Sequence, residues 1–251
     1  MNKHTFSELK KLGWNSLKGK YWYSFAMTLL VIAIVSFCSM LMYPISAVTI
    51  SNNIIMLQQT SDTVSSTMAA GPLLGTYFLY LLMNMLISIL ITLPITIGLM
   101  KFFINANTYT HNVSDIFFIF KNNFRNVIKI LFFKWLYTFL WSLLFIIPGI
   151  VKSYEYSMLT EILAENPALD RKHAFEITKA MTNGNKWRIF LFNFSFIGWM
   201  LLTCITFGIG SPFLTPYIYA SFVQLYFELK ENAIANGYVA AEEFQFDIET
   251  K

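Results

Sequence analysis

Residues 146–164 of the 251-residue chain read IIPGIVKSYEYSMLTEILA. This stretch decides the fold, because it follows a long apolar run and yet carries Lys152, Glu155 and Glu161. Its apolar residues recur at helical spacing, which predicts a helix over 150–164; they are Val151, Tyr154, Met158 and Ile162. Whether this helix crosses a bilayer or lies in the interface decides on which side of the membrane every later loop lies.

Long uncharged runs surround this stretch. The chain is 56% hydrophobic and only 13% charged, about half the charged fraction of an average soluble domain. Residues 21–61, 63–100 and 189–227 contain no charged side chain, and each run exceeds the roughly 20 apolar residues that span a bilayer. The composition therefore predicts a multi-pass membrane protein and excludes a disordered or ordinary soluble chain.

The distribution of Lys and Arg predicts the orientation of the helices. The polar stretch 51–71 has no Lys or Arg and is expected as an external loop, whereas residues 101–129 and 165–188 carry basic clusters. Both clusters are cytoplasmic only if 150–164 crosses the membrane. We therefore expect an all-α bundle of six transmembrane helices in three hairpins, with the N- and C-termini cytoplasmic. The expected spans are Trp22–Tyr43, Leu73–Leu99, Asn126–Ile147, Ile150–Ala164, Trp187–Phe207 and Phe213–Leu229.

Three parts follow from this topology. Residues 1–20 form an amphipathic cytoplasmic N-terminal helix, 21–230 the six-helix transmembrane domain, and 231–251 an acidic cytoplasmic tail. Within the second part, Asp170 is expected to cap a short cytoplasmic helix over about 171–181. Helix-breaking residues mark the expected turns of two hairpins; they are Pro148, Gly149, Gly208, Gly210 and Pro212.

The N-terminal helix has an apolar face and five lysines against one glutamate, Glu8. Thr5 and Glu8 have the spacing of a capping box. Because each Lys near an anionic surface contributes about 1 kcal/mol, we expect this helix on the anionic inner leaflet; a generic positive-inside anchor is the alternative. The expected membrane-surface anchors are Lys10, Lys11, Lys18, Lys20, Trp22, Lys186 and Trp187.

No residue pattern indicates catalysis. His4, His111 and His173 are isolated in the sequence, and Cys38 and Cys204 lie in apolar runs where packing explains them. We expect no catalytic residue, no metal and no cofactor. The basic residues sit in short clusters beside apolar runs, so nucleic acid is not an expected partner.

The charged stretch supplies the candidate polar intramembrane site. Lys152 and Glu155 are three residues apart and can pair on one helix face, whereas Glu161 falls on the opposite face. Charges in the bilayer need protein or water around them, so one interpretation is a hydrated cavity that holds a polar ligand or a lipid headgroup. In the other, Lys152 and Glu161 reach the two interfaces and only Glu155 needs a partner. The candidate residues are Lys152, Ser153, Glu155, Ser157, Thr160 and Glu161.

On several of these motifs, the chain resembles a bacterial family of integral membrane proteins, domain of unknown function 975. The resemblance is strongest over about 120–230; its motifs are IIPGIVKSYEYSM at 146–158, ILAENP at 162–167, SFIGW at 195–199, GIG at 208–210 and PY at 216–217. The Ile-Pro-Gly hairpin is more distantly similar to the membrane regions of some glycerophosphodiester phosphodiesterases. The family resemblance implies a bacterial cytoplasmic membrane and no particular activity.

Three functions remain open at this point. The favoured expectation is a non-enzymatic membrane protein that binds lipid, a peptide or an envelope protein as an accessory or protective factor. The alternative is a small transporter or channel for peptides or lipids that uses the polar face of residues 150–164, and an intramembrane enzyme is the least favoured. Expected partners are anionic inner-leaflet lipids, and a membrane protein or a second copy of the chain.

Overall fold

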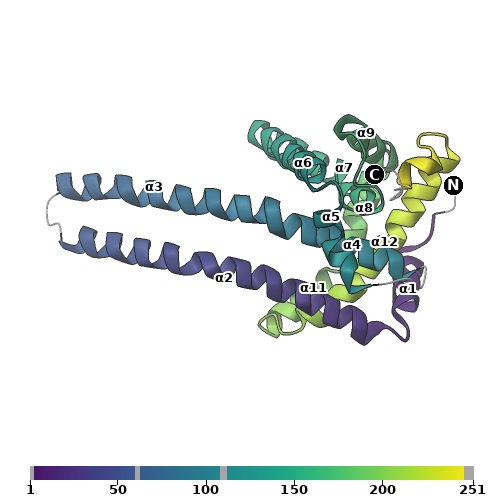
Figure 1. Ribbon diagram of the computed structural model, residues 1–251, viewed down its shortest axis with the longest axis horizontal. Helices are drawn as coiled ribbons and strands as arrows, with labels where there is room; N and C mark the ends of the chain where they lie inside the picture. Colours follow the sequence, from purple (N-terminus) through teal and green to yellow (C-terminus); the bar gives the residue numbers. More distant parts are fainter. Residues whose placement is uncertain (1–2, 60–62, 108–111, 246–251) are drawn as a thin grey trace. The chain divides into compact units, whose positions relative to one another are not determined.

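The computed structural model describes residues 3–59, 63–107 and 112–245, and every regular element in these ranges is helical (Figure 1). The all-α prediction is confirmed. Among the described residues, four helices are long and apolar enough to cross a membrane, which indicates a membrane protein. They are Tyr21–Met40, Gly75–Ala106, Phe124–Leu144 and Lys186–Ile205. The chain divides into unit 1, Met1–Val31 with Pro94–Lys251, and unit 2, Ile32–Leu93.

Unit 2 consists of the later part of α2 (Tyr21–Gln59), α3 (Thr63–Ile87) and the π-helical turn η1 (Ser88–Thr92). The expectation of a loop over 51–71 is wrong for 51–59 and 63–71, which are helical, whereas 60–62 lie outside the described residues. No Gly or Pro interrupts the sequence from 51 to 70, and each further helical residue adds a hydrogen bond once a helix has formed. Polarity alone therefore does not end these helices.

The expected span 73–99 continues through η1 into α4 (Leu93–Ala106). The amide of Leu93 donates to the carbonyl of Ser88, a π-type bond directly before Pro94, which has no amide proton to donate. Within unit 1, most residues of α4 are buried. An ideal Cβ at Gly98 would lie 2.0 Å from the carbonyl oxygen of Ile116 in the short helix η2 (Val113–Phe117). Only glycine permits this approach.

The N-terminal helix α1 (Phe6–Leu17) packs lengthwise against α12 (Ser211–Ala235) (Figure 1). The capping box of Thr5 and Glu8 is present as expected. Leu9 and Leu17 are at most 1% exposed, and an ideal Cβ at Gly13 would lie 2.8 Å from the Cα of Ser221. The apolar face that we expected on the membrane surface is thus covered by α12. Packing against a protein helix removes this apolar area from water, as a membrane surface would.

The deciding stretch forms two helices rather than one. Helix α6 (Phe124–Leu144) ends at Phe145, where the backbone is extended, and α7 (Ile146–Glu155) returns beside α6. Pro148 and Gly149 therefore lie inside the first turns of α7 and not in the break. A proline is compatible with the first turn of a helix because the first four amides have no intrahelical partner. The single helix expected over 150–164 is wrong: Tyr156–Met158 form a turn before α8 (Leu159–Glu165).

Helix α9 (Arg171–Thr182) confirms the short helix expected at about 171–181, and Asp170 caps it as expected. The expected span 187–207 agrees with the candidate span Lys186–Ile205, within which a turn at Ser195 and Phe196 separates α10 (Lys186–Phe194) from α11 (Ile197–Ile205). The next break is confirmed, since Gly208 has a φ of +85° between α11 and α12. Gly210 lies in the same turn and Pro212 in the first turn of α12.

The C-terminal residues as far as Gln245 pack against other parts of unit 1. Helix α12 extends to Ala235, six residues beyond the expected end at Leu229, and a short 3-10 helix, η3 (Ala241–Phe244), follows. Phe244 is 4% exposed. The side chain of Asn166 donates a hydrogen bond of 2.9 Å to the carbonyl of Glu243. This part of the acidic tail is therefore attached to the turn after α8, and residues 246–251 lie outside the described residues.

Candidate functional site

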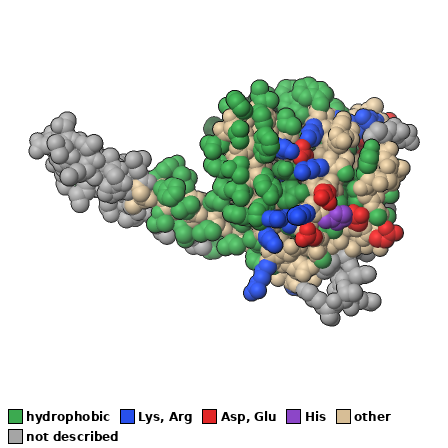
Figure 2. All heavy atoms as spheres, turned by 90° about the horizontal axis from the view of Figure 1, so that it is seen from above, with side chains coloured by type: hydrophobic (Ala, Val, Ile, Leu, Met, Phe, Trp, Pro, Cys, Tyr) green, Lys and Arg blue, Asp and Glu red, His purple; other side chains and the backbone are tan. Residues whose placement is uncertain are grey.

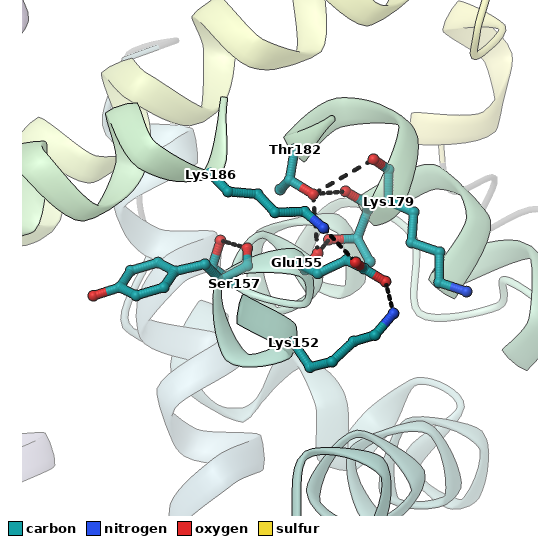
Figure 3. Close-up of polar contacts among 8 residues, drawn as sticks. Lys152, Glu155, Ser157, Lys179, Thr182 and Lys186 are labelled. Carbon is teal, nitrogen blue, oxygen red and sulfur yellow. Dashed lines mark hydrogen bonds and ion pairs between the residues drawn. The ribbon is translucent and has the colours of Figure 1, made fainter. Parts of the chain in front are cut away.

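The candidate site begins with Glu155, the last residue of α7, which is only 6% exposed. Lys152 donates a hydrogen bond of 2.7 Å to one carboxylate oxygen, Oε1, so the expected contact within the helix is present. Lys186, the first residue of α10, donates to the other oxygen, Oε2. Figure 3 shows the two lysines reaching Glu155 from different sides. One buried carboxylate thus joins two hairpins, as a buried charge requires partners.

The backbone at the same residue explains why α7 ends there. The main-chain carbonyl of Glu155 accepts hydrogen bonds of 3.2 Å from the hydroxyl groups of Thr178 and Thr182. Both threonines are on α9 and are completely buried. The carbonyl is therefore satisfied by side chains and does not need the amide of Leu159, which donates to Tyr156 instead. Side chain and backbone of Glu155 together connect α7, α9 and α10.

A cavity of about 420 Å³ lies beside this cluster. Four cationic side chains and one carboxylate, Glu176, line it together with aromatic rings. The lining residues are Tyr137, Trp141, Lys152, Tyr156, Arg171, Lys172, Phe175, Glu176 and Lys179. Lys172 and Lys179 are exposed, and the amino group of Lys179 points away from Glu155 in Figure 3. The cavity can therefore offer positive charge to an anionic group, most readily to phosphate or carboxylate oxygens.

Aromatic side chains fix two of the cations. The guanidinium carbon of Arg171 lies 4.0 Å from the ring centre of Phe133. The amino group of Lys152 lies 5.5 Å from the ring centre of Trp141. Both distances are in the range of cation–π attraction. The cavity therefore combines charge with aromatic rings, which favour the boundary between water and a bilayer.

Helix α9, which supplies most of the cavity cations, is fixed at its start by Asp170. The carboxylate of Asp170 accepts a hydrogen bond of 3.0 Å from the amide of Lys172. This hydrogen bond to the ionised form lowers the pKa of Asp170 below its ordinary value. A negative charge also suits the positive end of the helix dipole. The ionised carboxylate of Asp170 therefore stabilises the start of the helix that carries Arg171, Lys172 and Lys179.

The remaining predicted site residues do not line this cavity. The hydroxyl of Ser157 donates to the carbonyl of Tyr154 at 2.8 Å, whereas Ser153 is exposed and Thr160 half-buried. Glu161 is 4% exposed on α8, and among the described residues its Oε2 has no hydrogen-bond partner. Of the six candidates, the structure brings together Lys152 and Glu155, whereas Glu161 lies on a different helix, α8, so the spacing argument for a single helix does not apply to it.

The expected surface anchors divide into two groups. Lys11, Lys18, Trp22 and Trp187 are exposed, as an interfacial role requires, and Lys20 is half-buried. Lys186 is instead a partner of Glu155, and Lys10 donates a hydrogen bond of 2.9 Å to the carbonyl of Ser195. Arg171, Lys172 and Lys179 were not among the site residues predicted from the sequence. The alternation of Arg171, Lys172 and Lys179 with the apolar face of the expected helix was the available sign of a cationic surface.

The sequence around this site matches a known family model. A model described as "Protein of unknown function (DUF975)" matches residues 73–233, which is more than half of the chain. The chain belongs to the DUF975 family. No curated protein and no solved structure matches it. The DUF975 region contains the Glu155 cluster and every residue that lines the cavity, whereas α1 precedes it.

Proposed function

We propose that this DUF975 protein is a non-enzymatic membrane protein that binds a phosphate-bearing group of net negative charge, as an accessory or protective factor of the bacterial cytoplasmic membrane. The observation that carries the proposal is the cavity with Lys152, Arg171, Lys172 and Lys179 around it and Glu176 as its one lining carboxylate. Excess positive charge beside aromatic rings favours the anionic headgroup of a membrane lipid. The same chemistry would accept a soluble phosphate, and the experiment below separates these sources.

The proposed topology keeps six membrane-embedded segments in three hairpins, with both termini cytoplasmic. The segments are α2, α3 through α4, α6, α7, α10 with α11, and α12. The tip of the second hairpin is apolar and open: Phe145, Ile146 and Ile147 are 70%, 76% and 75% exposed. Such a tip suits lipid rather than water. Figure 2 shows charged and hydrophobic side chains gathered on separate parts of the drawn surface, which supports an embedded part and a wet part.

The depth of the second hairpin follows from the length of α7. Its 10 residues rise about 15 Å, half of the roughly 30 Å hydrocarbon core. If the tip at Phe145 lay at the outer surface, Glu155 and the cations around it would lie at the bilayer centre, where each charge costs about 2.5–3.5 kcal/mol on insertion scales. We therefore propose that the hairpin enters from the cytoplasmic side and returns, with the Glu155 cluster at the cytoplasmic interface.

Native mass spectrometry of the purified protein in detergent tests the proposed ligand. Phosphatidylglycerol and phosphatidylcholine with identical chains are titrated separately, and inorganic phosphate is added as a competitor. We expect the anionic lipid to bind at least tenfold more tightly. Lys172→Gln with Lys179→Gln should weaken binding of the anionic lipid and reduce that preference, because each lost charged hydrogen bond costs about 1.5–3 kcal/mol.

The matched control is Lys3→Gln with Lys121→Gln, which removes the same charge from two exposed lysines outside the cavity. It should leave the preference intact. Displacement of the lipid by millimolar inorganic phosphate would identify a soluble phosphate as the natural source. Equal binding of the two lipids, or equal losses in both variants, would contradict the proposed function.

A further inference from the structure

A second cavity lies within unit 1, between α1 and the hairpin of α11 and α12. Its volume is about 780 Å³. Aromatic and aliphatic side chains form most of its wall, and polar side chains of α1 form the rest. The lining residues from α1 include Ser7, Lys10, Lys11, Trp14 and Asn15; the residues from α11 and α12 are Trp199, Phe213, Leu214 and Tyr217. One side of the cavity is thus cationic and polar, and the other side is apolar.

An apolar groove of about 290 Å³ continues from this cavity between α11 and α12. The two spaces share Trp199, Phe213 and Leu214 as walls, so they adjoin. The hydroxyl groups of Thr203 and Thr206 donate to carbonyls of their own segment, Met200 at 2.7 Å and Thr203 at 3.0 Å. Because these hydroxyls are already used, the two threonines add little polarity to the groove. The combined space is therefore amphipathic along its length.

Packing of the surrounding helices fixes the polar end. Gly13 allows α1 to approach Ser221 of α12 closely, and the hydroxyl of Tyr21 donates a hydrogen bond of 2.8 Å to the carbonyl of Phe213. The amino group of Lys10 lies 4.1 Å from the ring centre of Phe196, and burial lowers its pKa. Lys11 is exposed, with its charge available at the cavity. Helix packing and side-chain contacts therefore fix the position of the polar end of the cavity.

We infer that this space is a binding site for an anionic amphiphile, with the acidic headgroup at Lys10 and Lys11 and one acyl chain in the groove between α11 and α12. Charge complementarity and the apolar groove together select this occupant. A polar metabolite would leave the groove between Trp199 and Leu214 unfilled, and an alkane would leave the lysines without an anion. The volume of the cavity, about 780 Å³, is in the range of ordinary ligand sites. The site goes beyond the proposed function, and its lining shares no residue with the cavity beside Glu155.

Two pairs of variants test this site. Leu214→Trp fills the junction of cavity and groove, and Leu201→Trp makes the same change at a position that is 60% exposed and lines neither space. Lys11→Gln removes the exposed headgroup charge, and Lys3→Gln removes an exposed charge elsewhere on the same segment. All four are made in the Lys172→Gln, Lys179→Gln background, so that binding at the first cavity is weakened.

The probes are lysophosphatidylglycerol and lysophosphatidylcholine with the same single chain, titrated by native mass spectrometry. Leu214→Trp is expected to weaken both probes about tenfold, because both need the groove. Lys11→Gln should weaken only the anionic probe, by about fivefold, and both control variants should bind as the background does. The melting temperature in detergent checks that each variant is folded.

Three results would overturn the inference: unchanged binding in folded Leu214→Trp, equal loss of both probes in Lys11→Gln, or a protein dimer that Leu214→Trp disrupts while lipid binding persists. The last result would assign the groove to a second copy of the chain. Failure here leaves the phosphate-group proposal standing, since that proposal rests on Lys172 and Lys179.

Discussion

Lys186 donates a hydrogen bond to the carboxylate of Glu155, which lies 31 residues earlier in the chain. The contact joins the last residue of α7, in the α6–α7 hairpin, to the first residue of α10. Lys152 occupies the other oxygen at 2.7 Å. A single carboxylate therefore pairs with two lysines, one from each of two hairpins.

Replacing Glu155 by Gln tests this arrangement. The amide keeps the shape of the side chain but leaves two ammonium groups close together without their counter-charge. We expect a loss of about 1–3 kcal/mol in the free energy of unfolding, the usual cost of leaving buried polar partners unsatisfied. SDS titration of the protein in mixed micelles measures the loss.

The control for this variant is Glu176→Gln, which removes a carboxylate that is 71% exposed and lines the same cavity. It should change stability by less than 0.5 kcal/mol or so, as surface charges usually do. The double variant Glu155→Gln, Lys186→Met should lose less than the two single variants together, because the residues are coupled. Strict additivity would show that the contact contributes nothing.

A dependence on pH is expected at the start of α9. Because the folded protein lowers the pKa of Asp170 from 3.8, the folded state favours the ionised carboxylate. Its contribution is complete above pH 3.8 and is lost as the pH falls below that value through the lower folded pKa. As the pH falls below 3.8, hydrogen exchange of the α9 amides should therefore become faster relative to hydrogen exchange of the α12 amides. Asp170→Asn, which keeps a capping side chain, should remove this specific acceleration, and its persistence would contradict the role of Asp170.

Close packing of α4 gives a test of the buried part of unit 1. A methyl group at Gly98 would overlap the backbone of Ile116, which cannot move away as a side chain could. Gly98→Ala should cost at least about 1–3 kcal/mol, the usual range for overpacking. Gly198→Ala makes the same change in α11, where nothing lies within 4 Å, and it should be tolerated. Equal melting temperatures of the two variants would contradict the packing of α4 against η2.

The sequence allowed prediction of the elements whose ends have local signals. The capping box at Thr5 starts α1, Asp170 starts α9, and Gly208 lies in the turn between α11 and α12. The turn after Glu155 could not be predicted, because it depends on hydroxyl groups of Thr178 and Thr182 that are distant in sequence. The turn at Ser195 also has no proline or glycine at the break itself.

Of the candidate site, the sequence allowed prediction of the part that lies within one turn of helix. Lys152 and Glu155 are three residues apart, and helical geometry alone brings them together. Lys186 was expected as a membrane anchor, since a lysine beside tryptophan is typical of the interface. Its contact with Glu155 depends on how α10 packs against α7, which periodicity within either helix does not reveal.

The central claim is that the α6–α7 hairpin returns the chain to the side of the membrane that holds α1. Single cysteines at Lys11 and Lys179, both exposed, test it in a chain whose Cys38 and Cys204 are replaced by serine. A membrane-impermeant maleimide is applied to intact cells and to inverted membrane vesicles. The account predicts that both positions react only in the inverted vesicles. Labelling of position 179 in intact cells, with position 11 still protected there, would contradict it.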